Sequence, residues 1–248
     1  MPPVSVAGAL LRRATLENDL EEAPTATSNA IAELRIRGIR LILALVACLG
    51  CAAAAAAADA LPCNLDFAVV RDGDVIGHHR VSSTAQGGKL VVGIDVAIKV
   101  DVLFVTAFRY EQQREETWQG GRLVTFTSKT NDDGTLHDIA GEAVAEGIKV
   151  TAGKESRVVP LDSLPTSYWN VEMVKRGPLL DTIGGRLLKT TVAPAGDETI
   201  QAGGRRITAT HYVLTGDLPR ELWYNAEGHW VKMRAKGRDG SIVEWILK

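Results

Sequence analysis

Hydrophobic and polar residues alternate along most of the chain after residue 60. Between Leu90 and Tyr110 almost every even-numbered position is apolar, whereas the odd-numbered positions include Asp95, Lys99 and Asp101. A period of two is typical of antiparallel strands that bury one face. Because a single strand of about twenty residues is unusual, we expect Asp101 to mark a bend, bulge or turn.

Turn signals recur at the spacing expected for hairpins. Glycine adopts the positive φ that tight turns require, and a basic residue after it begins the next strand in solvent. No Gly-Lys-Ser/Thr sequence accompanies these glycines, so we interpret them as turns and not as phosphate loops. The signals are Asp72-Gly73, Asp133-Gly134, Asp239-Gly240, Gly87-Gly88-Lys89, Gly120-Gly121-Arg122, Gly184-Gly185-Arg186 and Gly203-Gly204-Arg205.

These turns divide the chain into about ten to twelve strands. So many strands do not form a flat, open sheet. The sequence therefore predicts an all-β fold with a large curved antiparallel sheet, which forms a barrel or half-barrel.

Residues 165–170, Pro-Thr-Ser-Tyr-Trp-Asn, interrupt the pattern between two β-rich halves. The residues that follow carry helix signals and predict one short helix near residues 170–176, which can cover an open end of the sheet. The signals are Asn170 at the start, Glu172 in the first turn, Lys175-Arg176 in the last turn and Gly177-Pro178 after it.

Aromatic residues and histidines are absent from the first sixty residues. This asymmetry predicts a single β-domain over residues 61–248 behind a non-globular leader. Residues 1–34 are polar and aperiodic, and we interpret them as disordered or as a mis-started extension. Residues 35–60 combine three arginines, an apolar run and the sequence Ala-Asp-Ala, which predicts a signal peptide cleaved after Ala60.

Two other interpretations of the leader remain open. Leu45-Val46-Ala47-Cys48 fits the pattern at which bacterial lipoproteins are lipidated, here on Cys48. Alternatively, the apolar residues 41–58 stay in place as a membrane anchor. All three interpretations export the domain to the periplasm, either free or membrane-anchored, with membrane contact only through the leader.

Charge and cysteine content exclude several classes of function. The net charge is −2 without a basic patch, which argues against a nucleic-acid partner. Cys63 is the only cysteine after residue 60, so a disulfide framework is excluded. The chain has no H-E-x-x-H motif and no histidine pair at i, i+2, so the sequence predicts neither a metal site nor a cofactor.

The candidate catalytic residues are few, and we predict no catalytic site. His78 and His79 are adjacent in a strand and must face opposite sides of it. Ser167 lies outside any Gly-x-Ser-x-Gly elbow. A hydrolase that uses His79 or His211 with an acidic partner is the least favoured of three functional hypotheses.

Large aromatic residues gather near the end of the chain. Trp223 and Trp230 lie in the last strands, and Tyr168 and Trp169 could join them in a cluster at a barrel mouth. Such a cluster serves a packed core or binds an amphipathic ligand. Trp230 shares strand parity with Lys232 and other cations, so its ring could lie beneath them, or their stems could cover it on a solvated face.

Several motifs together resemble an uncharacterised family of secreted proteobacterial proteins, known only as a domain of unknown function. The resemblance covers residues 61–248 and implies an exported, all-β envelope protein without an assigned reaction. Asn225 stands where the resemblance leads us to expect Asp. The motifs are Arg71-Asp72-Gly73 with Ile76-Gly77-His78-His79, Pro165-Thr166-Ser167-Tyr168-Trp169-Asn170, and Leu222-Trp223-Tyr224 with Trp230-Val231-Lys232.

Export, long apolar strand faces and the lack of a catalytic motif favour a non-enzymatic envelope protein. In the first hypothesis it binds a lipid or another hydrophobic or amphipathic envelope component through Tyr168, Trp169, Trp223 and Trp230. In the second it is a structural or interaction module with a packed core and an envelope protein as partner. A hollow interior would favour the first hypothesis, and a filled interior would favour the second.

Overall fold

The alternating stretch forms the longest hairpin of the fold. Strand β3 (Lys89–Val102) and strand β4 (Val105–Gln119) pair antiparallel along their whole length. The turn is formed by Leu103 and Phe104, and the register shifts just after Val100. The break expected near Asp101 is therefore present as an irregular strand end followed by a tight turn.

The computed structural model describes residues 64–248, apart from the side chain of Val102. The predicted cleavage site at Ala60, the alternative lipidation site at Cys48 and the other leader predictions lie outside these residues. No helix within residues 64–248 is long and apolar enough to cross a membrane.

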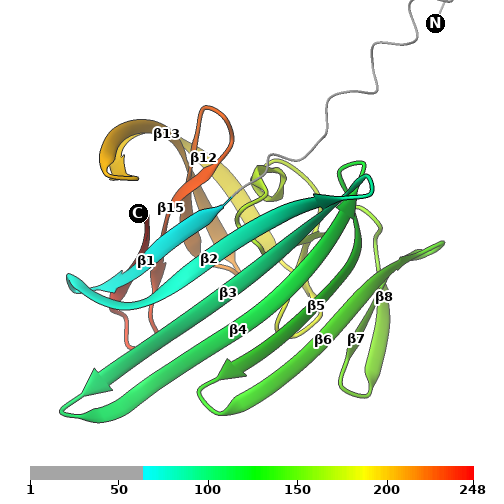
Figure 1. The fold of residues 1–248 in the computed structure, drawn as a ribbon, viewed down its shortest axis with the longest axis horizontal. Helices are drawn as coiled ribbons and strands as arrows, with labels where there is room; N and C mark the ends of the chain where they lie inside the picture. The colour runs from blue at the N-terminus through cyan, green and yellow to red at the C-terminus, as the bar shows by residue number, and fades with distance from the viewer. Residues whose placement is uncertain (1–63) are drawn as a thin grey trace, which may run out of the picture. The chain divides into compact units, whose positions relative to one another are not determined.

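Thirteen strands form one antiparallel sheet, with β8 and β12 at its two edges (Figure 1). The last strand, β16, pairs with β1, so that Leu247 lies opposite Phe67. Apart from β3 and β4, the strands are β1 (Leu65–Arg71), β2 (Asp74–Gln86), β5 (Arg122–Asp132), β6 (Thr135–Val144), β7 (Gly147–Ala152), β8 (Glu155–Val159), β12 (Thr190–Ala202), β13 (Arg205–Gly216), β14 (Arg220–Asn225), β15 (Trp230–Lys236) and β16 (Ile242–Leu247).

The sheet curves around its apolar face, which forms the main core. In β3 the even-numbered residues Leu90, Val92 and Ile94 are buried, as the alternation predicts. Other large side chains that are almost completely buried on this inner face are Phe67, Phe126, Ile139, Ile148, Leu214, Leu222, Trp230 and Met233.

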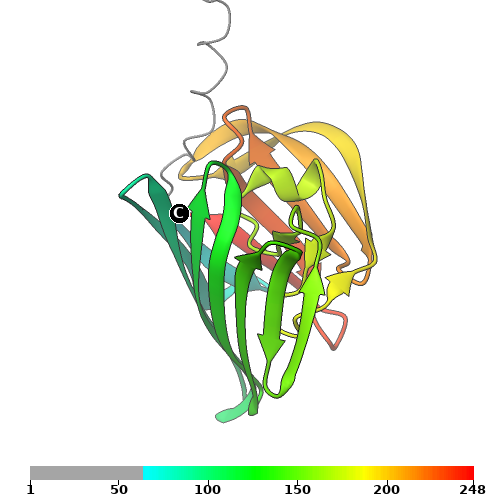
Figure 2. The ribbon, with the colours of Figure 1, turned by 90° about the vertical axis from the view of Figure 1, so that its right-hand side faces the viewer.

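Residues 160–189 connect the two edge strands and lie between the two halves of the sheet (Figure 2, yellow-green). This linker contains strands β9 (Leu164–Pro165), β10 (Leu179–Leu180) and β11 (Leu187–Leu188), which form a second, small sheet. Residues 163–169 are all buried. The linker therefore packs against the inner face of the sheet and does not run through solvent.

The predicted all-β class and curved antiparallel sheet are confirmed, although the sheet has thirteen strands where ten to twelve were expected. The predicted helix is a single 3₁₀ turn, η1 (Val171–Val174). Asn170 caps it as predicted, because its side-chain oxygen accepts a hydrogen bond from the Glu172 N–H at 3.1 Å.

Candidate functional site

A cavity of about 660 Å³ lies between the inner face of the sheet and the linker. This volume is within the range of small-molecule sites, about 300–1,000 Å³. Most of its wall is apolar. The apolar lining residues are Ile76, Val96, Ile98, Val100, Ala107, Phe108, Tyr110, Tyr168, Ile183, Leu188, Leu218, Met233, Ala235, Val243 and Trp245.

Polar groups converge where the linker meets the sheet. Arg114 of β4 and Arg220 of β14 both line the cavity there, together with His79 of β2. The guanidinium of Arg220 lies 5.4 Å from the centre of the Tyr168 ring. This polar end of the cavity therefore carries two guanidinium groups beside an aromatic surface.

His79 is held neutral in this environment. Its ring is 3% exposed and lies edge-on to Trp230, 5.0 Å between ring centres, and to Tyr168. Burial, followed by the nearby charges of Arg114 and Arg220, lowers the pKa of His79 to about 3. The two arginines also oppose the burial that raises the pKa of Tyr110 to about 12. The positive charges of Arg114 and Arg220 therefore act on both His79 and Tyr110.

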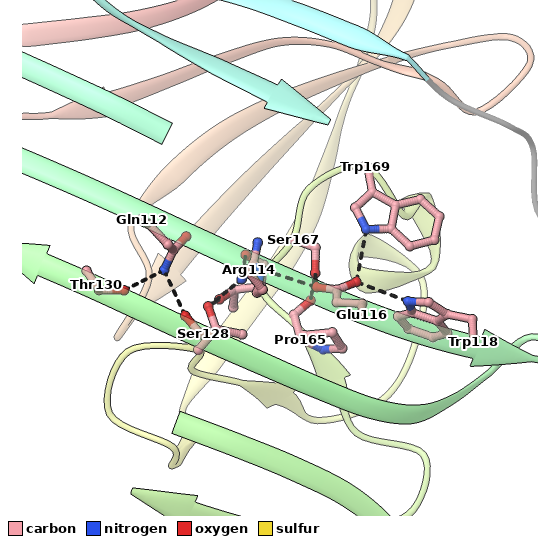
Figure 3. Close-up of polar contacts among 11 residues, drawn as sticks. Gln112, Arg114, Glu116, Trp118, Ser128, Thr130, Pro165, Ser167 and Trp169 are labelled. Atoms are coloured by element: carbon pink, nitrogen blue, oxygen red, sulfur yellow. Dashed lines mark hydrogen bonds and ion pairs between the residues drawn. The ribbon is translucent and has the colours of Figure 1, made fainter. Parts of the chain in front are cut away.

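Arg114 is fixed by the linker and by its own strand (Figure 3). One guanidinium nitrogen donates to the Thr182 hydroxyl at 2.5 Å and to the Thr166 carbonyl oxygen at 3.5 Å. Its Nε lies 3.3 Å from Oε1 of Glu116, and both side chains are almost fully buried. Only the geometry of the surrounding hydrogen bonds makes such a buried pair tolerable.

Glu116 is the central acceptor of this network (Figure 3). It is fully buried and accepts hydrogen bonds from the indole N–H groups of Trp118 and Trp169, at 3.0 and 3.1 Å. Ser167 donates a third, at 2.5 Å. Ser167 therefore anchors the linker to β4, and it makes no hydrogen bond to a histidine in the described part of the chain.

Three of the four predicted ligand residues belong to the main core. Tyr168 lines the cavity and lies 5.4 Å, ring centre to ring centre, from Trp230. Trp230 is fully buried and stacks on Phe67. Trp169 packs edge-on against Trp118. Of these predicted residues only Tyr168 reaches the cavity wall. Trp230 packs against its ring, whereas Trp169 is bonded to Glu116.

Trp223 lies apart from them, in a small second cluster with Ala202, Ala209 and Val231. The ring beneath the cations is Trp223 and not Trp230, since Lys232 lies 5.4 Å from the centre of the Trp223 ring. Trp223 pairs with Lys232 and Tyr224 pairs with Trp230, so Val231 is an extra, unpaired residue in β15. This bulge places Trp230 and Lys232 on opposite faces of the strand. The proposed position of Trp230 under the cations was therefore wrong.

The histidines considered for hydrolysis lack a nucleophile. Nδ1 of His211 lies 2.8 Å from Glu198, and its Nε2 lies 3.1 Å from Glu221. His211 also stacks on Trp223. Among residues 64–248, neither His79 nor His211 hydrogen-bonds to a hydroxyl, and no group of three or more His, Cys, Asp or Glu residues could hold a metal ion.

The cavity is also bordered by charged residues at hairpin turns. Arg71 contacts Asp239 at 2.6 Å, and Arg186 contacts Asp217 at 2.8 Å. Arg238 of the β15–β16 turn reaches Asp132 at the end of β5, also at 2.6 Å. These pairs join turns that are distant in sequence around the cavity's rim.

Sequence reasoning missed the polar residues of β4. Gln112, Arg114 and Glu116 share the parity of Tyr110 and Trp118, so alternation alone would have placed them on the buried face. Polar side chains at core positions of an otherwise regular strand mark a functional or strained site. That signal was present in the sequence.

Comparison with solved structures identifies a similar fold. The crystal structure of a β-barrel-like protein of domain of unknown function DUF1849 from Brucella abortus matches with a TM-score of 0.55 and 12% identity, over 75% of this chain and 94% of that one. No curated protein is significantly similar in sequence. A family model matches residues 67–248, and the chain therefore belongs to the family described as a domain of unknown function, DUF6134.

Proposed function

We propose that this domain binds a hydrophobic or amphipathic small molecule in the cavity between the sheet and the linker. The observation that carries the proposal is the cavity of about 660 Å³ with a mostly apolar wall. A domain that only served as a scaffold would gain stability by filling this space, because empty apolar volume lowers the free energy of unfolding.

The leader predicted from the sequence supports export, and we place the binding event in the periplasm. An amphipathic ligand of the cell envelope is then the natural occupant of the cavity. Sequencing the N-terminus of the mature protein from the periplasmic fraction tests the export part. A full-length product that stays in the cytosol would overturn it.

Binding is tested with purified protein and N-phenyl-1-naphthylamine, a neutral apolar probe that fluoresces when it leaves water. We expect saturable binding at one site, lost in Val96→Trp, which fills the cavity from β3. Val91→Trp, on the opposite face of the same strand, is the matched control and should retain binding. No saturable binding by the wild-type protein would refute the proposal and favour the structural or interaction module.

A further inference from the structure

The polar end of the cavity suggests what kind of head group the ligand carries. We infer that the cavity takes an amphiphile with an acidic head, a carboxylate or a phosphate, placed against Arg220. This inference rests on the proposed function and specifies its ligand.

Arg220 lacks a carboxylate partner. It is half-buried, and its contacts are the Tyr168 ring at 5.4 Å and the sulfur of Met233 at 3.8 Å. None of the ion pairs among residues 64–248 includes it. A guanidinium that is partly withdrawn from water without a counter-ion loses part of its hydration, and an anionic ligand would offset that loss with charge-assisted hydrogen bonds.

The carboxylates that line the cavity are engaged elsewhere. Asp217 and Asp239 pair with other arginines. Asp181 accepts hydrogen bonds from the backbone N–H groups of Ile183 and Gly184, and Asp133 accepts one from the backbone N–H of Arg109. No lining carboxylate is therefore placed to neutralise Arg220, whereas Arg114 already has Glu116 as its counter-ion.

Two further nitrogen atoms beside the cavity lack a hydrogen-bond partner. They are Nε2 of His79 and Nε1 of Trp245, both buried and without a partner among residues 64–248. Both residues line the cavity and are less than one-tenth exposed. Because buried polar groups are normally paired, the indole N–H of Trp245 favours a ligand with an oxygen acceptor.

The test compares dodecanoate, dodecyl phosphate, dodecanol and dodecyltrimethylammonium as competitors of N-phenyl-1-naphthylamine. The four share one chain and differ in the head. We expect the two anions to displace the probe at least tenfold more tightly than dodecanol, and their order tells a carboxylate ligand from a phosphate ligand. Equal displacement by dodecanol and the anions would overturn the head-group inference, while a lack of probe binding would overturn the proposed function itself.

Arg220→Gln should reduce anion affinity to that of dodecanol and leave dodecanol unchanged. Arg122→Gln, an exposed arginine outside the cavity lining, is the control and should keep the preference. Arg114 is avoided because it holds the linker. If Arg220→Gln still bound the anions more tightly than dodecanol, the head group would not lie against Arg220.

A separate observation concerns the hairpin turns at the rim end of the sheet. Turns β1–β2, β3–β4, β5–β6 and β15–β16 lie at one end, because alternate turns of an antiparallel sheet share an end; the first three lie toward the lower left of Figure 1. Most of the exposed large apolar residues among residues 64–248 lie at or beside these turns. They are Val75, Leu103, Phe104, Val105, Leu136 and Ile242.

The β3–β4 turn is the most exposed of them. Phe104 makes no burying contact within the domain, with a relative exposure of 104%. Leu103 and Phe104 both adopt positive φ, at 48° and 70°. Bulky residues rarely adopt this conformation, and Asn-Gly suits such a turn far better. Neither packing nor backbone geometry therefore accounts for an apolar pair here.

From these turns we propose that the rim inserts into the surface of a lipid bilayer. The apolar side chains stand on separate turns and not on one continuous face, which suits a fluid surface better than a rigid protein. The same end borders the cavity, whose wall includes Val100 and Phe108 beside the β3–β4 turn.

Charges at this end do not favour anionic lipids. Lys99 pairs with Asp101, and Arg109 pairs with Glu111, so cations beside the β3–β4 turn are already neutralised. We therefore expect attachment to neutral bilayers that depends only weakly on salt.

Flotation with phosphatidylcholine vesicles tests this proposal. We expect wild-type protein to float with the vesicles, and the double variant Leu103→Asn with Phe104→Gly to lose at least tenfold in vesicle affinity while its melting temperature stays the same or rises. Val158→Ser removes an exposed apolar residue from β8 and should float like the wild type. Wild-type protein that does not float would overturn the proposal and favour a protein partner at the rim; flotation of the double variant would overturn it too.

Discussion

The hydroxyl of Ser167 donates a 2.5 Å hydrogen bond to the carboxylate of Glu116, across 51 positions of sequence. Through this contact the linker between the edge strands is joined to an interior strand of the sheet. Ser167 and Trp169 come from the linker, whereas Glu116 and Trp118 belong to β4. The buried carboxylate thus determines where the linker lies and, with it, the polar end of the cavity.

Glu116→Gln should destabilise the domain strongly. The amide keeps the size of the side chain but leaves the guanidinium of Arg114 buried without its counter-charge. Breaking a buried pair in this way costs about 3–5 kcal/mol of unfolding free energy. Urea unfolding followed by tryptophan fluorescence measures the loss. Glu115→Gln, on the exposed face of the same strand, should change little, and equal effects of the two substitutions would contradict the role of Glu116.

Tyr224→Phe should loosen the linker without disturbing the sheet. The Tyr224 hydroxyl donates to the backbone carbonyl oxygen of Tyr168 at 2.8 Å in a buried setting. Its removal leaves that acceptor unpaired and should cost about 1–3 kcal/mol. We expect faster proteolytic cleavage within residues 160–189. Tyr212→Phe, at a half-buried ring of the neighbouring strand, is the control; an identical cleavage rate in both variants would mean that the Tyr224 hydroxyl does not hold the linker.

The local pattern of the chain predicted the strands well and the linker poorly. Alternation from Leu90 placed the buried face of β3 and the end of the hairpin. The small sheet in the linker has strands of two residues each, such as β9, which are too short to show a period. Its position depends on Glu116, and a contact over that sequence distance leaves no periodic signal.

Irregularities in strands account for the error among the aromatic residues. Parity along β15 predicted Trp230 beneath the cations, but one extra residue, Val231, separates the faces of Trp230 and Lys232. A bulge of one residue reverses every assignment beyond it. The cross-strand partner, Trp223, therefore lies beneath Lys232.

The low pKa of His79 predicts a loss of stability in mild acid. The folded state keeps the ring neutral down to about pH 3, whereas the unfolded chain binds a proton below about 6.5. The unfolded state thus holds more protons in this window, and stability falls as the pH is lowered through it. One such group should lower the unfolding free energy by roughly 1.5 kcal/mol between pH 6.5 and pH 5.

Unfolding curves at those two pH values check the effect. His79→Phe keeps an aromatic ring in the edge-on contacts with Tyr168 and Trp230 but cannot bind a proton, so its stability should change less with pH. His137→Gln, at a half-buried position of β6, should retain the wild-type pH dependence. The same pH dependence in His79→Phe as in the wild type would show that His79 is not the responsible group.

Gly141→Ala should strain the core at one defined contact. Gly141 lies opposite Phe126 in the β5–β6 pair, and a methyl group on it would collide with the buried Phe126 ring. Displacing a packed ring costs about 1–3 kcal/mol. Gly93→Ala is the matched control, since its methyl group would meet only the Ser82 hydroxyl oxygen at 3.2 Å.

A second substitution shows whether the ring is the obstacle. Phe126→Leu removes the atoms that the new methyl group would meet, so Gly141→Ala should cost less in that background than in the wild type. The two residues are in contact, and their effects should therefore not add. Thermal unfolding of the four proteins gives the coupling free energy. Strictly additive effects would mean that Gly141 is needed for its backbone conformation and not for the space it leaves to Phe126.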